Sequence, residues 1–348
     1  MNKKVYIVLL NYNESHDSIE CLESVLKLEY SNYQIIVIDN SETLQHFNDL
    51  QSWAKGDAIS IETQFKNLVY PLEKKPLSFL SSSEKDFLLG SKEEKIVFVK
   101  ADQNKGFAAG NNLALRYILS LGESDSYIWL LNNDTVVEKN VLANIISEID
   151  KEGNLNTDII YGTALLEYDN PTKVQSLGGL YHSRIGLTTH LGEGVLIDEA
   201  ILNFDKIVAN VSYPIGASII VKHADLESIG LLSEDYFLFY EEIDWVSRAK
   251  QKGGNVKILP VFGIYHKQGN STKSKINKQK SEFIDLVSMN SRITFAKKYN
   301  RNNLGFIYLS ILTLTIGKRI WQGNFKIIPK ILKLVFSTSK KLQQSNEN

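Results

Sequence analysis

Short apolar runs alternate with helix-like stretches over the first 135 residues of the chain. Val5–Leu10 and Gln34–Asn40 are apolar runs bounded by polar turns, which is typical of buried strands. Between them, apolar residues recur at helical spacing: Ile19, Leu22, Val25, Leu26 and Leu28. A strand, a helix and a second strand in this order predict a parallel pair with a right-handed crossover. Further strands are predicted at Lys95–Ala101 and from Tyr127, so the pattern predicts an α/β fold with a doubly wound, mostly parallel sheet and flanking helices.

Three other regions carry different patterns. The stretch from Asn48 to Glu94 is irregular, and we interpret it as an insertion on the surface. After residue 150, glycines punctuate short strands, which we assign to an acceptor half (about 136–275) beside a nucleotide-binding half (about 1–135) of one continuous domain. A helix starting near Lys278 opens a basic helical extension over 276–348.

Composition places the chain among globular proteins, with 348 residues, 43% hydrophobic and 23% charged. The one cysteine, Cys21, excludes an internal disulfide framework and fits a reducing compartment. It falls on an apolar helical face, where we expect a buried structural thiol. The N-terminal apolar run is too short for a secretory signal, so we expect a cytoplasmic protein.

The C-terminal extension is strongly cationic. Leu286–Lys341 contains eleven Lys or Arg residues and no Asp or Glu, while the rest of the chain carries 28 basic and 40 acidic residues. That distribution excludes a uniformly basic nucleic-acid binder. The apolar run Leu304–Ile316 is shorter than the roughly 20 residues that span a bilayer. Two interpretations stay open: a helix lying on the anionic inner face of the membrane, or a helix packed on the catalytic domain.

Polar clusters follow three of the predicted strands: Asn11-Tyr12-Asn13, Asp39-Asn40 and Asn132-Asn133-Asp134. The carboxyl ends of neighbouring parallel strands meet in one crevice, so we expect these clusters to meet in space. The Asp39 carboxylate can accept a hydrogen bond from a pyrimidine imide. The Asp134 carboxylate can hold a divalent cation that is bound to a diphosphate. Ordinary turn formation is the alternative for each, and for Asn40 it is our interpretation.

Three further segments carry candidate chemistry. Asn104–Asn112 is a glycine-rich turn before a helix, whose N–H groups can face an anion. Glu241, Glu242 and Asp244 follow an aromatic run, where like charges and low dielectric can raise the pKa of a general base. Acids in a first helical turn also complement the helix dipole. His266 follows a predicted strand, Ile258–Tyr265, and metal ligation stays open for it.

Together these clusters resemble inverting family 2 glycosyltransferases of the GT-A fold, rhamnosyltransferase-like bacterial members in particular. Nine motifs carry the resemblance in order over about Val5–Thr272: LLNYNES, CLESV, IIVIDNS, NKGFAAGNNLAL, WLLNNDT, GGLYHSRIGLTTHLGEG, PIGASIIVK, GLLSEDYFLFYEEIDWVSRAKQKGG and YHKQGNST.

The resemblance implies a role for each matching position. Asn11, Tyr12, Asn13 and Asp39 would hold the nucleoside. Near the ribose and diphosphate would lie Asn104, Gly106 and Asn112. Asp134 would bind Mg²⁺ or Mn²⁺, with Asn132 at the first position of an Asp-x-Asp-like site and His266 as a further metal or diphosphate ligand. Glu242 would be the catalytic base; because the family's Glu-Asp pair reads Glu-Glu here, Glu241 and Asp244 remain alternatives.

The implied function is transfer of a sugar from a nucleotide diphospho-sugar to a saccharide, with dTDP-rhamnose ahead of UDP-hexoses as donor. The acceptor is expected to be lipid-linked, in assembly of capsule, O-antigen or a related surface polysaccharide. A sugar-nucleotide nucleotidyltransferase is one rival, but the chain lacks an early glycine-rich basic signature for a triphosphate. The other is a non-catalytic, membrane-tethered sugar-binding protein, against which the presence of Asp134, Glu242 and His266 together argues. A dehydrogenase is excluded because no Gly-x-Gly-x-x-Gly follows the first strand.

Overall fold

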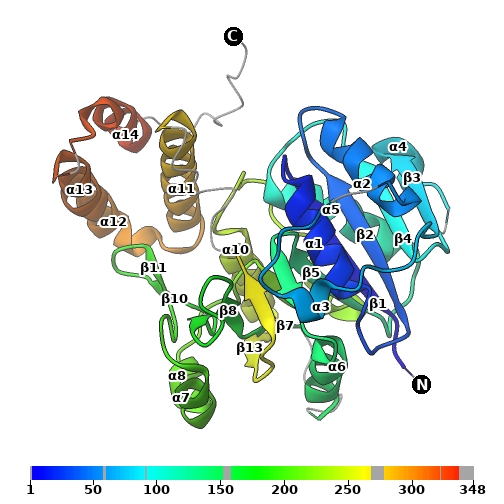
Figure 1. The fold of residues 1–348 in the computed structure, drawn as a ribbon. Helices are drawn as coiled ribbons and strands as arrows, with labels where there is room; N and C mark the ends of the chain where they lie inside the picture. The colour runs from blue at the N-terminus through cyan, green and yellow to red at the C-terminus, as the bar shows by residue number, and fades with distance from the viewer. Residues whose placement is uncertain are drawn as a thin grey trace.

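A computed structural model describes residues 2–57, 60–90, 92–151, 158–267, 278–321 and 323–336. These residues form a large central sheet with helices on both faces and a helical extension at one side (Figure 1). Eight strands of the described residues make up this sheet, in the spatial order β13 (Asn255–Leu259), β7 (Ile159–Thr163), β12 (Ser218–Lys222), β5 (Tyr127–Asn132), β1 (Val5–Asn11), β2 (Tyr33–Asp39), β4 (Ile96–Lys100) and β3 (Phe79–Ser83).

The sheet is mostly parallel. Strand β1 pairs in parallel with both β2 and β5, and β4 continues the parallel run next to β2. Only β12 runs against its neighbours, β5 and β7. The prediction of a doubly wound, mostly parallel sheet is therefore confirmed, and the polar residues that follow β1, β2 and β5 lie at one edge.

Side chains alternate between two cores because successive residues of a strand face opposite ways. Ile7 and Leu9 of β1 belong to one core, and Tyr6 and Val8 belong to the other. Helices α1 (Ser15–Val25), α2 (Gln45–Lys55) and α6 (Val141–Lys151) supply residues to the first core. The second core is completed by α5 (Phe107–Ser120), α9 (His223–Ile229) and α10 (Glu241–Gln251). Cys21 is buried in the first core, and burial raises the pKa of its thiol to about 12, as a structural thiol requires.

The interpretation of Asn48–Glu94 as a surface insertion is wrong in part. Besides α2, this region forms the short helices α3 (Lys66–Val69) and α4 (Glu84–Phe87), and Trp53 and Val69 enter the first core. Its strand β3 adds a parallel edge strand to the sheet. Because Ser81–Ser83 make that edge polar, its sequence looks like a loop.

The second half of the chain adds smaller sheets around the large one. Strands β6 (Thr135–Val137), β14 (Ile264–His266), β8 (Leu165–Glu167) and β9 (Val174–Ser176) form one of them, and β10 (Gly179–His182) with β11 (Leu187–His190) forms a hairpin. Short helices α7 (Ile197–Leu202) and α8 (Phe204–Val208) follow. The single strand expected at Ile258–Tyr265 is wrong: Pro260, which has no N–H, and Gly263, at φ 103°, divide it between β13 and β14.

The helical extension begins with α11 (Lys278–Tyr299), as predicted from residue 278. A helical segment from Arg301 to Trp321 follows, built from α12 (Leu304–Ser310), a π-helical turn and α13 (Ile316–Trp321), and then α14 (Ile328–Phe336). Within the described residues, the Arg301–Trp321 segment is the one helix that is long and apolar enough to cross a membrane by length and composition. Its mean hydropathy is 1.2. The apolar run Leu304–Ile316 is only part of this helix. Its short length therefore does not exclude a membrane-spanning helix, as the sequence argument had assumed.

Candidate active site

The three strand ends meet in a buried polar network. Asn11 donates through Nδ2 to Oδ1 of Asp39 at 2.6 Å, and Ser41 Oγ donates to the same oxygen at 2.6 Å. Oδ1 of Asn11 accepts from Ser18 Oγ at 2.8 Å and from Asn133 Nδ2 at 3.3 Å. The predicted convergence of the three strand ends is confirmed, and the side chain of Asn11 joins them through its bonds to Asp39 and Asn133.

Asp39 keeps one oxygen available within this network. Its side chain is fully buried, yet Oδ2 accepts no hydrogen bond from the described residues and lies 3.4 Å from Nζ of Lys100. Lys100 is itself held by the carbonyl oxygens of Asp39 (3.2 Å) and Ser41 (2.7 Å). A buried carboxylate oxygen in this state retains its capacity to accept a donor.

The glycine-rich turn packs against the loop that carries the acidic cluster. Gly106 has φ 97°, and a Cβ there would lie 2.1 Å from the carbonyl oxygen of Phe237, so only glycine fits. Phe107 N donates to the same oxygen at 2.9 Å. Asn104 Oδ1 accepts from Gly106 N at 2.9 Å, and Asn40 Nδ2 donates to the carbonyl oxygen of Gly106 at 3.3 Å. The turn thus fixes the start of α5 at the carboxyl edge of the sheet.

Tyr12 and Asn13 lie beside this turn. Tyr12 donates to Oε1 of Glu42 at 3.2 Å and also hydrogen-bonds with Asn104; burial raises the pKa of its phenol. Asn13 adopts φ 57°, and its N–H donates to Ser41 Oγ at 2.9 Å. Both residues are half-buried, so their side chains remain accessible at the edge of the network.

Asn112 has a different surrounding. It is buried on α5, where Nδ2 donates to the carbonyl oxygen of Leu232 at 2.9 Å and to Oε1 of Glu234 at 2.8 Å. Its Oδ1 accepts from Leu232 N at 3.0 Å. The side chain of Asn112 is therefore occupied in holding the 232–234 loop, an arrangement that leaves little of it for a ligand.

Asp134 and His266 are brought together although 132 residues separate them. Strand β14 pairs with β6, which places Nε2 of His266 3.1 Å from Oδ1 of Asp134 and 3.4 Å from Nδ2 of Asn132. Gln175 fixes the imidazole: its Nε2 donates to the carbonyl oxygen of His266 at 3.1 Å, so its Oε1, 2.7 Å from Nδ1, accepts. Nδ1 therefore donates to Gln175, and Nε2 is the ring nitrogen that faces Asp134.

This pair fits a divalent cation. Two ligand atoms about 2.1 Å from an octahedral ion stand about 3.0 Å apart in neighbouring positions, close to the separation of the Asp134 oxygen and His266 nitrogen. Among the described residues no group of three His, Cys, Asp or Glu gathers around one point. An ion here would take its other ligands from substrate oxygens and water, the usual pattern for Mg²⁺ on a diphosphate.

Glu241 and Glu242 begin α10 after a strained turn. Phe239 and Tyr240 both have positive φ (67° and 71°), a conformation that non-glycine residues adopt at a cost and that aims the two carboxyl groups. Burial raises the pKa of Glu242 to about 7, and burial with repulsion from Glu242 raises the pKa of Glu241 well above its usual value. Each carboxyl group has a buried Oε2 without a hydrogen bond from the described residues, so at least one holds a proton near neutrality.

Asp244 is engaged in structural contacts. It is fully buried and accepts from Nε of Arg248 (2.8 Å), Nζ of Lys298 (2.6 Å) and the hydroxyl of Tyr236 (3.1 Å). Both of its oxygens are therefore occupied by donors of the protein. Glu241 and Glu242, by contrast, each keep a carboxyl oxygen that accepts no hydrogen bond from the described residues.

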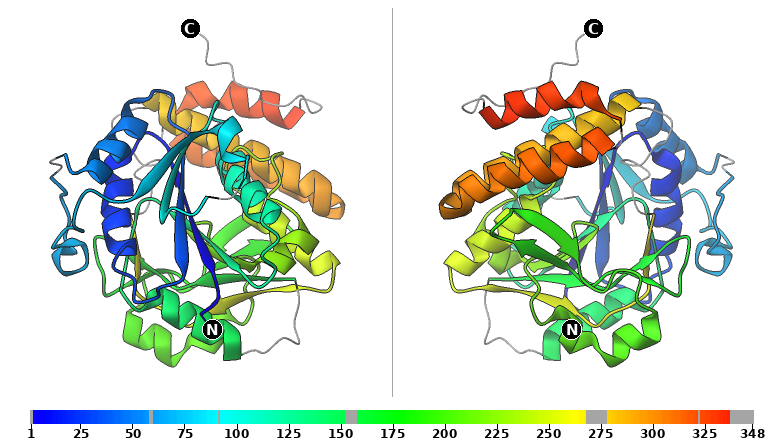
Figure 2. Two further views of the ribbon diagram at one scale, coloured as in Figure 1. Left: turned by 90° about the vertical axis from the view of Figure 1, so that its right-hand side faces the viewer. Right: turned by 90° about the vertical axis from the view of Figure 1, so that its left-hand side faces the viewer.

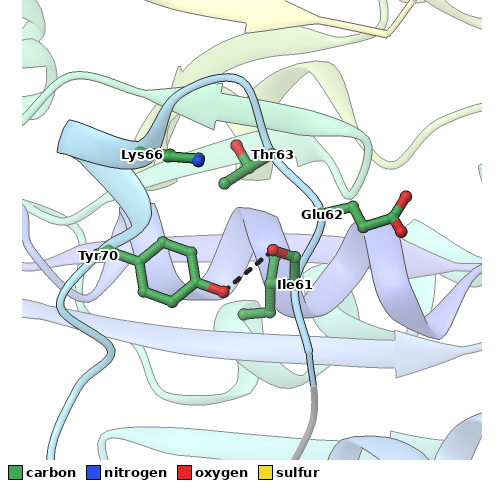
Figure 3. Close-up of a pocket in the computed structure, with 5 residues that line it drawn as sticks. All are labelled: Ile61, Glu62, Thr63, Lys66 and Tyr70. Atoms are coloured by element: carbon green, nitrogen blue, oxygen red, sulfur yellow. Dashed lines mark hydrogen bonds between the residues drawn. The ribbon is translucent and has the colours of Figure 1, made fainter.

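A surface hollow of about 570 Å³ lies elsewhere, in the segment between α2 and β3 (Figure 3). Ile61, Glu62, Thr63, Lys66 and Tyr70 line it, and the Tyr70 hydroxyl donates to the carbonyl oxygen of Ile61 at 3.0 Å. It contains none of the predicted site residues, and we assign it no role.

Several residues of the site were missed by sequence reasoning. Gln175, which orients His266, lies in a short strand with no motif to mark it. Asn40, interpreted as a turn former, is buried and bridges β2 to the glycine-rich turn. Its position directly after Asp39 was the available signal. Ser18, Ser41 and Lys100 are ordinary residues in sequence that matter only through the contacts above.

Known proteins similar to this chain are glycosyltransferases. The low-salt glycan biosynthesis hexosyltransferase Agl10 of Haloferax volcanii is 24% identical over 190 residues, which cover 54% of this chain. The match spans 57% of the length of that relative, and no family model matches the chain.

Two solved structures share the fold. The mannosyltransferase PcManGT from Pyrobaculum calidifontis, in complex with GDP-Man and Mn²⁺, aligns with a TM-score of 0.53 at 11% identity over 97% of this chain and 89% of its own. GalNAc-T7 with UDP, GalNAc and Mn²⁺ aligns with a TM-score of 0.52 at 12% identity, over 85% of this chain and 48% of its own. The predicted GT-A fold is thereby confirmed: the central sheet and its helices are those of GT-A glycosyltransferases.

Proposed function

We propose that this protein is an inverting, metal-dependent glycosyltransferase of family 2, similar to the rhamnosyltransferase-like members. It moves a sugar from a nucleotide diphospho-sugar to a saccharide acceptor in surface polysaccharide synthesis. The observation that carries the proposal is the pairing of Asp134 with His266 at the carboxyl end of β5, beside the Asn11–Asp39 network and within a GT-A fold.

The nucleoside binds at the ends of β1 and β2. Asp39 offers Oδ2, which accepts no hydrogen bond from the described residues, to a base N–H, and Tyr12 with Asn13 flanks the base and ribose. Asn104 and Gly106 bring backbone N–H groups of the α5 start to the diphosphate side. Asn112 supports this arrangement from behind by holding the 232–234 loop. The donor sugar proposed is dTDP-rhamnose, with UDP-hexoses as the second choice.

Asp134 and His266 hold the cation, with Asn132 beside them. A bound Mg²⁺ or Mn²⁺ stabilises the negative charge that develops on the leaving diphosphate. Gln175 keeps the His266 imidazole in the tautomer that presents Nε2 to this position.

Glu242 acts as the general base. It takes the proton of the acceptor hydroxyl while that oxygen attacks C1 of the sugar from the face opposite the diphosphate. The C1–oxygen bond of the donor breaks, the nucleoside diphosphate leaves, and the anomeric configuration inverts in one displacement. The pKa of Glu242, raised to about 7, suits a group that must accept a proton near neutral pH.

The second half of the chain, 136–275, forms the acceptor side. A lipid-linked saccharide is the acceptor proposed, at the cytoplasmic face of the membrane, in assembly of capsule, O-antigen or a related glycan. The cationic extension supports this location.

The test is a donor panel scored by thermal stabilisation of the purified protein with Mn²⁺ or Mg²⁺. A ligand at about a hundred times its dissociation constant stabilises the fold by roughly 2.7 kcal/mol, a readable shift. We expect a metal-dependent response to one nucleotide diphospho-sugar, lost in Asp134→Ala. A response to a nucleoside triphosphate with none to any diphospho-sugar would favour a nucleotidyltransferase. Sugar binding without nucleotide or transfer would favour a non-catalytic protein.

A further inference from the structure

The helical extension has a small core of its own. Ile307 and Ile311 of the Arg301–Trp321 helix pack with Ile327 and Ile331, next to residues of α11. Figures 1 and 2 show these helices grouped together at one side of the central sheet. The packing uses one side of the helix, so its other side faces outward.

That outward side is apolar. Large hydrophobic side chains along α12–α14 are between 50% and 87% exposed: Phe306, Leu309, Leu314, Ile320, Trp321, Phe325 and Phe336. Thr313, which lies among them, donates its hydroxyl back to the carbonyl oxygen of Leu309 at 2.8 Å and so presents its methyl group. Single exposed hydrophobic residues are ordinary on a protein surface, but seven large ones between positions 306 and 336 indicate an interaction site.

Cations accompany the apolar side chains. Lys318, Lys326 and Lys333 are exposed on the same helices, and Leu286–Lys341 contains no acidic residue. Apolar side chains mixed with lysines match the interfacial zone of an anionic bilayer. There the apolar side chains enter the acyl boundary and the lysines contact the lipid phosphates. A protein partner would be expected to match the charges with carboxylates, and a second copy of this cationic face would repel the first.

The helix is held in a way that decides between lying on a bilayer and crossing it. Ser310, near its midpoint, donates to the carbonyl oxygen of Ile185 at 3.0 Å, in the turn of the β10–β11 hairpin. Arg292 of α11 donates to both Ile185 O and Ser310 Oγ. Arg319 pairs with Asp285 of α11 at 2.6 Å. A spanning helix would have to break these contacts and bury their charges in lipid.

The extension also lies on the side of the active site. Phe283 of α11 packs edge-to-face on Phe237, whose carbonyl oxygen contacts the glycine-rich turn. Ser291 of α11 donates to the carbonyl oxygen of Leu238 at 2.8 Å, three residues before Glu241. In both views of Figure 2 the extension lies opposite the N-terminus, from which β1 runs toward its carboxyl end. The extension is therefore anchored, through α11, on the loop that leads to Glu241.

We propose that α12–α14 form a docking face that lies flat on an anionic phospholipid bilayer, with Phe306, Trp321 and Phe325 as its apolar anchors. The contacts that carry this inference do not involve the catalytic residues, so it stands whether or not the proposed transfer is correct. For a lipid-linked acceptor, docking would hold the active site next to the membrane in which that acceptor resides.

The test is binding of the full chain to vesicles of phosphatidylcholine alone and of phosphatidylcholine mixed with phosphatidylserine. We expect binding to the anionic vesicles that weakens with salt, and a loss of at least tenfold in Trp321→Ser/Phe325→Ser. Each of Lys326→Gln and Lys333→Gln should weaken binding by about fivefold. Leu202→Ser, at a residue 84% exposed on α7, is the matched control and should bind like the native protein.

Tryptophan fluorescence reports the contact directly. The chain has four tryptophans, of which Trp53, Trp129 and Trp245 are at most 2% exposed and Trp321 is 87% exposed. A blue shift on binding, absent in Trp321→Ser, would support insertion of this face. Failure of the native protein to bind anionic vesicles would overturn the proposal. So would concentration-dependent dimerisation abolished by Trp321→Ser/Phe325→Ser, or bound protein that neither salt nor alkaline carbonate releases, as a spanning helix would require.

Discussion

At the scale of single residues, Glu241 is buried and its neighbour Glu242 is half-buried, and the raised pKa of each predicts a pH response of the protein. One must stay protonated for the other to ionise, because two adjacent charges in low dielectric repel. Asp244, only two residues further on, is instead paired with Arg248 and Lys298. Three acids within four positions thus do different work because their neighbours differ.

Glu242→Gln is predicted to abolish transfer while preserving donor binding. A missing general base costs about 10²- to 10⁴-fold in rate. In the native protein kcat/KM should rise as pH passes through about 7, where Glu242 becomes ionised. Steady-state rates across pH, with donor affinity by calorimetry, check this. Asp244→Asn should instead lower Tm with donor binding retained only in the folded fraction; if it selectively removes transfer, Asp244 is the base.

Glu242→Gln is also predicted to change the stability of the protein in a pH-dependent way. Because the folded-state pKa of Glu242 is raised above its unfolded value of 4.5, the folded state keeps a proton that the unfolded state releases. The part of the native stability that is linked to Glu242 is therefore fully present below about pH 4.5 and is lost as pH rises to about 7. Glu242→Gln should have a higher Tm than the native protein at pH 8 and an equal Tm at pH 4. An equal Tm at both values would show that Glu242 is not buried as described.

Gln175 is predicted to control metal affinity without touching the metal. Gln175→Leu removes the acceptor on Nδ1 of His266, and loss of such a contact typically weakens metal binding about 10- to 100-fold. Titration of Mn²⁺ by thermal shift measures it, in the presence of the donor. Gln51→Leu, on the surface-facing side of α2, is a control expected to leave the Mn²⁺ response unchanged. Equal Mn²⁺ affinity in Gln175→Leu would argue against His266 as a ligand.

At the scale of elements, the active site depends on two turns that lock together. The glycine-rich turn before α5 contacts the strained turn before α10 through the Phe237 carbonyl oxygen. Gly106→Ala should disturb both turns. The added Cβ would lie 2.1 Å from that oxygen, and the alanine would have to adopt φ 97°. Gly122→Ala is matched to it: φ is 67°, but nothing lies within 4 Å of the added Cβ.

We expect Gly122→Ala to lose about 1 kcal/mol of stability, the cost of a strained backbone alone. Gly106→Ala should lose more and also reduce donor affinity, measured by urea denaturation and calorimetry. If both variants lose the same stability and both bind donor normally, the two turns are not coupled.

The elements also show what a sequence can and cannot predict. Strands β1, β2, β4 and β5 and helix α5 were predicted because their apolar periodicity and polar ends are local signals. The edge strand β3 was missed because Ser81–Ser83 pair with β4 through their backbone but bury little of their side chains. Asp39 and Asp134 could be named from their strand ends, whereas Gln175 and Lys100 act through contacts made only in the folded chain.

At the scale of the whole molecule, the extension is joined to the catalytic core. Arg292 and Ser310 hold Ile185, and the hydroxyl of Tyr240 donates to the carbonyl oxygen of Gly186 at 2.7 Å. Tyr240 immediately precedes Glu241, so the hairpin turn at 185–186 lies between the extension and the proposed base. Removing the extension would remove Arg292 and Ser310 and so leave this turn without their hydrogen bonds.

Arg292→Met is predicted to lower both stability and transfer. Hydrogen bonds from a buried charged donor contribute about 1.5–3 kcal/mol each, so the loss should be clear by urea denaturation. Transfer should fall through kcat, with donor affinity unchanged. Arg116→Met breaks an exposed ion pair with Glu234 and should change stability by at most about 1 kcal/mol. Equal effects of the two substitutions would mean that the 185–186 turn does not depend on Arg292.

The edge strand β3 has a consequence for the behaviour of the protein in solution. Without it, β4 would expose a row of unpaired backbone groups beside the apolar residues Ile96–Val99, a template for pairing with another chain. Strand β3 covers this row and ends the sheet in three serines, which offer an incoming strand little apolar surface. Strand β3 thus protects the edge of β4, and its removal would favour pairing of this edge with another chain.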